Sequence, residues 1–298
     1  MLLVALGLTG ATLGLGAGRP AASLARSVAG RIVCAVDPSN ACRRDPELVA
    51  AYGAALAAKL RAHAPGIAYE RGMRALPVDF RSCRDSGCGD GPPTGSVSRT
   101  AAGLPVVAFV HVVDCRVGRA APFTGRNPAV DCGGSRSGNL YLQYWTYYAD
   151  SATLRGVPVA GGKGYHGDDW EGYQVRIGPD GDIDARASSH HGFNYEQGRA
   201  NWGSDAGIGP LKAATEMVGA RPGGGWGPET GWLYVSGGSH AGNAKADRTD
   251  YVRVTQRRRL ALIPLDPFGA GEELAPRFAI FPPWLKEVWI NPEAEETD

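Results

Sequence analysis

The chain has 298 residues, of which 43% are hydrophobic, and its formal net charge at pH 7 is +1. The near balance of 31 basic and 30 acidic residues gives no electrostatic reason to expect nucleic acid or an anionic membrane as a partner. Glycine and proline, with 43 and 21 residues, favour many turns and short strands over long helices. The composition therefore predicts a globular protein that is mainly β.

An uncharged, apolar segment occupies residues 1–18. Its length lies between that of a signal-peptide core and that of a transmembrane helix. Ser23 and Ala25 are small residues at the two positions that a signal peptidase reads, so we predict that residues 1–25 are a signal peptide. A retained N-terminal membrane anchor is the alternative. Either interpretation predicts a secreted or cell-envelope protein.

The six cysteines also favour export, because disulfides form in oxidising compartments. Many connectivities are possible, and pairing between sequence neighbours is a preference. Cys83 and Cys88 could contribute to a zinc site, but no second cysteine or histidine pair accompanies them. The expected disulfides join Cys34 to Cys42, Cys83 to Cys88, and Cys115 to Cys132.

The clearest helix begins at Asp45 and ends before Pro65. Asp45 suits the N-cap position and Pro46 the first helical position. We expect the helix to pack on the edge of a β core through an apolar stripe at every fourth residue. The stripe consists of Leu48, Tyr52, Leu56 and Leu60.

The rest of the chain is rich in short extended segments with turn residues between them. The first segment is strongly apolar, which indicates a strand buried on both faces, and its His111 reads as a core residue. Two of the segments flank Pro179-Asp180-Gly181 and form a hairpin. The expected strands are 104–115, 139–148, 170–177, 183–188, 231–235 and 260–265.

Residues 30–292 contain no repeat, linker or break in charge, so we predict one domain, followed by an acidic tail at 293–298. The predicted fold class is mainly β: two antiparallel sheets packed as a β-sandwich, with a peripheral N-terminal helix and long loops.

One short stretch concentrates groups that bind metals or move protons: His166, Asp168, Asp169 and Glu171. In an extended chain Asp169 and Glu171 share one face and Trp170 lies on the other. Two neighbouring carboxylates require a cation, a shared proton or hydrogen bonds, and a divalent metal is one such partner. Alternatively, all four are solvated, or one carboxylate caps a loop while another pairs with an arginine.

Further histidines can reach this cluster. The hairpin register places His190 and His191 opposite residue 170, at the rim of the site together with Tyr165 and Trp170. His240 lies on a glycine-rich turn at the end of the strand 231–235 and is a candidate ligand.

The sequence His166-Gly167-Asp168-Asp169-Trp170-Glu171-Gly172 resembles the His-Asp-Trp-Glu core of the necrosis-inducing-protein-like family. It is also similar to the Asp-Trp-Glu region of the vacuolar-protein-sorting-associated protein 62 family, whose Gly-Ser-His-Ala element resembles residues 238–241. The resemblance implies a secreted β-sandwich with a divalent-cation site. Asp168 stands where the first family usually has a second histidine, so the resemblance does not extend to cytolytic activity.

The predicted metal ligands are His166, Asp168, Asp169, Glu171 and His240, around Ca²⁺ or Mg²⁺, with Zn²⁺ or Mn²⁺ as competitors. The favoured hypothesis is a non-enzymatic protein that binds a glycan or lipid head group. One alternative is a metal-dependent hydrolase with Asp169 or Glu171 as general base, and another is a structural envelope protein. No nucleophile motif is present, which favours binding.

Overall fold

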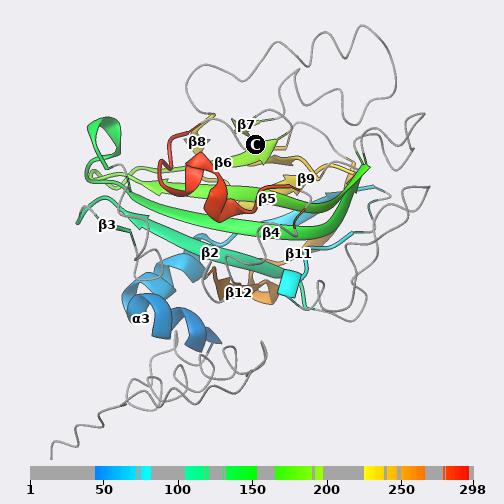
Figure 1. Ribbon diagram of the computed structural model, residues 1–298, viewed down its shortest axis with the longest axis horizontal. Helices are drawn as coiled ribbons and strands as arrows, with labels where there is room; N and C mark the ends of the chain where they lie inside the picture. The colour runs from blue at the N-terminus through cyan, green and yellow to red at the C-terminus, as the bar shows by residue number, and fades with distance from the viewer. Residues whose placement is uncertain are drawn as a thin grey trace, which may run out of the picture.

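Two β-sheets and one kinked helix are the main elements of the part of the chain that the computed structural model describes (Figure 1). That part comprises residues 44–71, 73, 75–81, 105–117, 119–120, 130, 132–152, 165–189, 192–196, 225–237, 240–246, 250–265, 278 and 280–294. The predicted signal segment 1–25 and Cys34, Cys42, Cys83 and Cys88 lie outside it.

The helix α3 spans Pro46–His63, as its cap and stop signals predict, but it is kinked at Gly53, whose φ of 78° and ψ of 161° are not helical. Its side chains enter the core of the sheets: the Tyr52 hydroxyl donates a hydrogen bond to the carbonyl of Val110 over 2.8 Å. Asp45 does not cap the helix through its side chain and instead forms an ion pair with Arg61. No helix among the described residues is long and apolar enough to span a membrane.

The larger sheet has the strand order β12-β2-β4-β5-β6-β7, with β3 paired to β2 and β8 paired to β6. Its long strands β4 and β5 cross the centre of Figure 1 and are antiparallel neighbours over their whole length. The bounds are β2 Val107–Asp114, β3 Arg119–Ala120, β4 Leu140–Ala152, β5 Tyr165–Ile177, β6 Ile183–Ser189, β7 Gly192–Asn194, β8 Gly227–Pro228 and β12 Ala261–Pro264.

The smaller sheet has the order β10-β9-β1-β11. Its strands are β1 Gly66–Glu70, β9 Trp232–Val235, β10 Gly242–Asn243 and β11 Tyr251–Thr255. The mainly β, sandwich-like prediction is confirmed, but both sheets are mixed, since β1 runs parallel to β9 and β2 parallel to β12. Each parallel pair joins strands that are far apart in sequence, and a long connection permits a parallel return.

Both faces of the larger sheet are buried. One face meets α3 and the smaller sheet in a core that includes Val110, Tyr144, Tyr173 and Leu233. The other face carries an aromatic cluster beneath the C-terminal segment, in which Phe80, Phe109, Trp145, Tyr147, Trp170, Phe278, Trp284 and Trp289 take part. The aromatic residues Trp145 and Tyr147 of β4 therefore pack the interior.

Among the described residues, short 3₁₀ helices span Gly134–Arg136, Arg257–Arg259, Pro283–Leu285 and Glu287–Trp289. Glu293 and Ala294, the first two residues of the predicted acidic tail, pack against the fold. The Glu293 carboxylate accepts hydrogen bonds from Tyr141 and Trp226 and pairs with Arg176.

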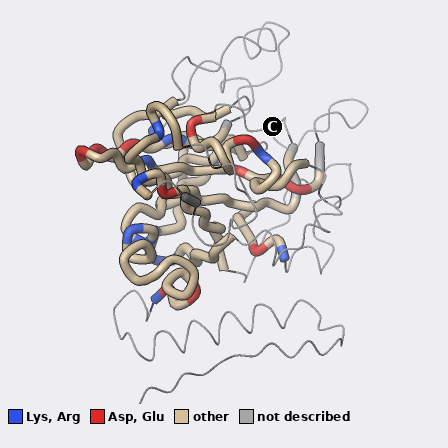
Figure 2. The backbone as a smooth tube through the Cα atoms, turned by 60° about the vertical axis from the view of Figure 1, so that its left-hand side comes forward, with Lys and Arg blue, Asp and Glu red and all other residues tan. Residues whose placement is uncertain are grey.

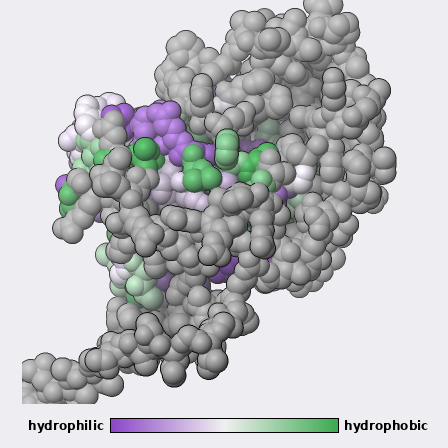
Figure 3. All heavy atoms as spheres, viewed as in Figure 1, coloured by the Kyte–Doolittle hydropathy of each residue, from purple (hydrophilic) through white to green (hydrophobic). Residues whose placement is uncertain are grey.

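A disulfide joins Cys115 to Cys132, which is one of the expected local pairs. In the view of Figure 3 the described surface shows small apolar patches beside polar ones, with grey atoms between them. Phe281 and Leu285 are among the exposed large apolar residues.

His111 is a fully buried core residue of β2. Its ring stacks on Trp289 with a centroid distance of 3.5 Å, and its Nδ1 lies 2.9 Å from Oε1 of Gln143. Because the Gln143 amide nitrogen donates to the Val288 carbonyl, its oxygen is the acceptor, and Nδ1 carries the proton. Burial lowers the pKa of His111 from 6.5 to about 4.

We expect stability to fall as the pH drops from about 6.5 to 4, because the unfolded chain gains a proton on His111 that the folded protein does not accept. The pKa difference corresponds to about 3 kcal/mol in the free energy of unfolding. Between pH 6.5 and 4, the free energy of unfolding of His111→Gln, measured with urea, should fall by about 3 kcal/mol less than that of the parent protein. Val112→Ala, which destabilises the same strand but keeps the histidine, should retain the full drop; equal pH profiles for parent and His111→Gln would contradict this expectation.

Candidate functional site

The carboxylates of the central motif separate onto the two faces of β5. Asp169 opposes Tyr148 of β4, and Trp170 opposes Tyr147, which belongs to the aromatic cluster on the other face. Asp169 and Glu171 therefore point toward the smaller sheet, as the two-residue period of a strand requires. Trp170 is a core residue behind the two carboxylates and does not line a rim.

Asp168 lies on the face opposite to Asp169. Its Oδ1 accepts a hydrogen bond of 2.6 Å from the hydroxyl of Tyr147. Its φ of 62° is in the left-handed region that non-glycine residues rarely adopt. The predicted ligand set is thus divided, with Asp168 in the aromatic cluster and Asp169 and Glu171 between the sheets.

The turn between β9 and β10 brings His240 to Asp169. The turn is closed by a hydrogen bond from the Ser236 amide to the Ala241 carbonyl, and the Gly237 amide donates to Oε2 of Glu70 over 2.6 Å. His240 has a φ of 56°, so the two non-glycine residues with positive φ in the described part of the chain are Asp168 and His240. Such backbone conformations persist where the surroundings hold them, and they gather at functional sites.

Asp169 and His240 form a buried pair, with 5% and 1% of their surfaces exposed. Nδ1 of His240 lies 2.7 Å from Oδ2 of Asp169. A carboxylate only accepts hydrogen bonds, so Nδ1 must be the donor, and the lone pair of the neutral ring is on Nε2. Nε2 is buried and has no hydrogen-bond partner among the described residues.

Tyr148 packs against the histidine of this pair. Its ring stacks on the His240 ring with centroids 4.0 Å apart and an interplanar angle of 12°. Burial raises the pKa of the Tyr148 hydroxyl well above 10, and the charges of Glu171 and Asp169 raise it further. The phenol therefore stays neutral at physiological pH and remains a hydrogen-bond donor beside the two carboxylates.

Glu171 is held by the neighbouring strand. The Ser188 hydroxyl donates a hydrogen bond to Oε2 of Glu171 and in turn accepts one from the Gly172 amide. Glu171 is more exposed than Asp169, so the carboxylate pair has an inner and an outer member.

The remaining predicted ligand, His166, and the predicted rim residues Tyr165, His190 and His191 are at the border of the described residues or beyond it. The backbone of His166 pairs with Ser151 and that of Tyr165 with Ala152 in the β4–β5 ladder, but their side chains lie outside the described part of the chain. His190 and His191 lie outside it entirely. Within the described residues, no group of three histidine, cysteine or acidic side chains has a metal-binding arrangement.

The sequence interpretation did not include Glu70, Tyr148 or Ser188 in the site. Ser188 could have been found from the hairpin register, because the ladder continues from the pair Tyr173–Ala187. Glu70 enters through the parallel pairing of β1 with β9, which no local pattern indicates.

The chain matches no protein-family model, no curated protein and no solved structure in the comparisons. Its chemistry must therefore be inferred from the arranged side chains. An imidazole that donates one nitrogen to a carboxylate presents its other nitrogen either as a metal ligand or as a proton acceptor.

Proposed function

We propose that this chain is an exported binding protein in which His240 and Glu171, with Asp169 as the support of His240, hold one divalent cation. The cation would contact a glycan or a lipid head group. The observation that carries the proposal is the buried Nε2 of His240, whose lone pair has no described partner. Leaving such a nitrogen unpaired costs free energy, and a bound cation would offset that cost.

In the Asp169–His240 contact, the carboxylate lies behind the imidazole, an arrangement that is common at metal sites. Histidine ligands usually donate their second ring nitrogen to a carboxylate, which fixes the tautomer and raises the basicity of the ring. An imidazole donor also favours Zn²⁺ or Mn²⁺ over Ca²⁺, which prefers oxygen ligands. The resemblance to secreted cation-binding sandwiches supports the same proposal.

A hydrolase is the second candidate, favoured by the same pair. An aspartate that orients a histidine through Nδ1 prepares Nε2 to accept a proton from water or a hydroxyl group. In this alternative His240 is the general base, because Asp169 is already occupied as its hydrogen-bond acceptor.

The full chain, purified without chelator, is expected to contain about one divalent cation, measured by elemental analysis. A cation present at 100 times its Kd stabilises a protein by about 2.7 kcal/mol. EDTA should therefore lower the Tm by roughly 5–10 °C for a chain of this size. Reloading with Zn²⁺, Mn²⁺, Ca²⁺ and Mg²⁺ in turn would rank the metals.

The matched variant is His240→Asn, because asparagine tolerates the positive φ of this position and lacks the imidazole. We expect it to lose the metal and the EDTA effect, together with the cation-dependent part of any binding to glycan arrays and lipid vesicles. A parent protein that contains no metal and does not respond to EDTA would contradict the cation site. Hydrolysis of generic ester and glycoside substrates that disappears in His240→Asn would favour the enzyme.

A further inference from the structure

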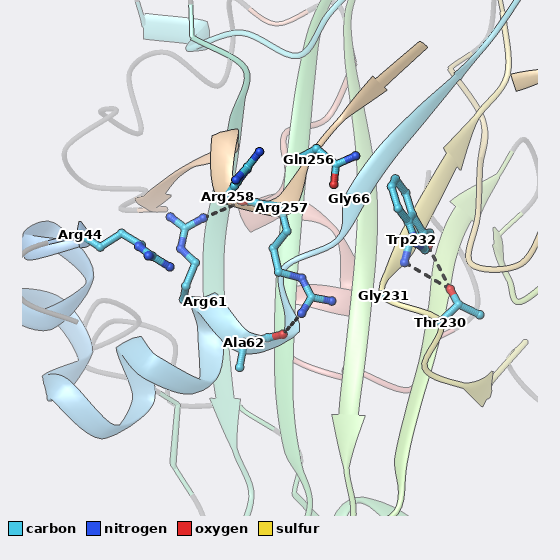
Figure 4. Close-up of a pocket in the computed structure, with 10 residues that line it drawn as sticks. All are labelled: Arg44, Arg61, Ala62, Gly66, Thr230, Gly231, Trp232, Gln256, Arg257 and Arg258. Atoms are coloured by element: carbon cyan, nitrogen blue, oxygen red, sulfur yellow. Dashed lines mark hydrogen bonds between the residues drawn. The ribbon is translucent and has the colours of Figure 1, made fainter. Parts of the chain in front are cut away.

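A second candidate site lies at the other end of β9, where a cleft of about 500 Å³ opens between the C-terminal half of α3 and the start of that strand. Figure 4 shows the side chains of Arg44, Arg61, Arg257 and Arg258 on one side of the cleft and the ring of Trp232 on the other. Sites for small ligands span about 300–1,000 Å³. The cleft therefore has the size to hold a small molecule or part of an oligomer.

Arg61 connects the helix α3 to the turn that lines this cleft. Its guanidinium forms an ion pair with Asp45, and its Nη1 donates to the carbonyls of Arg257 and Leu260 over 3.0 and 2.8 Å. These bonds fix the turn 257–260 against the helix. Arg257 and Arg258 of this turn are therefore held at the cleft before any ligand binds.

The other three arginines keep their charges. Arg257 donates to the Ala62 carbonyl at the end of α3, which satisfies the helix terminus without neutralising the guanidinium. Arg44 and Arg258 are exposed and form no ion pair with any described residue. Glu229 lies nearby in the chain, but it pairs with His63.

This concentration of charge is local. Lys and Arg are interspersed with Asp and Glu along the coloured part of the backbone in Figure 2, in keeping with a net charge of +1. Arginine binds phosphate and sulfate oxygens through paired N–H groups. No carboxylate lines the cleft, so its charge favours an anion over a cation.

Trp232 adds a flat apolar wall. A Cβ atom at position 66 would lie 2.7 Å from its ring, so the ring packs directly on the backbone of Gly66 and is held in place. A half-exposed aromatic ring opposite cationic groups suits a ligand with one flat apolar face and one anionic edge.

We propose that this cleft binds a phosphate or sulfate group carried on a sugar ring, with Arg44, Arg257 and Arg258 contacting the anion and Trp232 packing on the ring. The site is independent of the cation site, because the two lie at opposite ends of β9. Its concave shape fits a saccharide better than the flat surface of a membrane.

The experiment is isothermal titration of the full chain with a sulfated hexasaccharide, with inorganic phosphate, and with phosphatidylglycerol vesicles. The parent protein should bind the hexasaccharide more tightly than phosphate. The double variant Arg44→Ser/Arg258→Ser should weaken hexasaccharide binding by at least about tenfold, since hydrogen bonds to charged groups are individually strong. Trp232→Leu should remove the preference for the saccharide over phosphate.

Arg259→Ser is the matched control, because Arg259 is exposed in the same 3₁₀ turn but does not line the cleft. It should leave binding unchanged, as should EDTA and Asp169→Asn, which separates this site from the cation site. Equal losses in Arg259→Ser and the double variant would overturn the proposal. So would the absence of hexasaccharide binding, binding to vesicles alone, or equal affinity for phosphate and hexasaccharide.

Discussion

Replacing Asp169 with asparagine is expected to weaken divalent-cation binding about 10- to 100-fold, the usual effect of losing a carboxylate behind a histidine ligand. The carboxylate accepts the Nδ1 proton of His240 and so keeps the lone pair on Nε2. An amide can also donate to Nδ1, which would favour the tautomer with its proton on Nε2 and block that nitrogen. The loss of negative charge lowers the basicity of the ring as well. Isothermal titration with Zn²⁺ and Mn²⁺ would measure the change.

Asp168→Asn provides the control, since it makes the same chemical change one residue away. Asp168 is equally buried, but its hydrogen bond goes to Tyr147 on the opposite face of the sheet. Asparagine also tolerates its positive φ. We expect this variant to retain the cation affinity of the parent. If Asp168→Asn lost the cation and Asp169→Asn kept it, the proposed arrangement of the site would be wrong.

The same two residues show how far sequence patterns could lead. The two-residue period of a strand is enough to place Asp169 and Glu171 together and Trp170 behind them. The same period places Asp168 on the opposite face of the strand. The predicted ligand set included Asp168 because it grouped the acidic residues by their proximity in sequence. The hairpin was likewise predictable, because a tight turn around Asp180 fixes the register of its strands.

Long-range pairing was not predictable from local pattern. Asp169 and His240 are 71 positions apart, and Arg61 and Arg257 are 196 positions apart. The first contact depends on where β9 lies in the smaller sheet, beside β1 and parallel to it. The second depends on the antiparallel pairing of β1, which follows α3, with β11, which precedes Arg257. Turn chemistry and hydrophobic period act over a few residues, so they could suggest His240 as a ligand but could not identify its partner.

A similar long-range contact attaches the C-terminal segment to the larger sheet. Arg186 of β6 is completely buried, and its guanidinium lies over the rings of Phe193 and Trp226, with distances of 4.3 and 4.5 Å to their centroids. It donates to Oε1 of Gln174 and to the carbonyls of Pro292 and Ala294. Arg186 therefore adds to the contacts that attach the C-terminal segment to the larger sheet.

Replacing Arg186 with methionine is expected to destabilise the protein by about 4 kcal/mol, because each buried acceptor that loses its donor costs about 1–3 kcal/mol. Methionine avoids the cost of burying a cation and fills much of the same volume. It leaves the carbonyls of Pro292 and Ala294 and the Gln174 side-chain oxygen without this donor, and it loses the contacts between the cation and the two rings. Urea unfolding would measure the change.

The matched control is Arg176→Met. Arg176 also lies over Trp226, at 4.6 Å, and pairs with Glu293 and Asp184, but it is partly exposed. Water can replace its hydrogen bonds, so we expect a loss of about 1 kcal/mol. The difference between the two variants would measure the effect of burial on otherwise similar arginine contacts. Equal losses would mean that Arg186 acts mainly through its packing on the rings, and that the buried carbonyls find other donors.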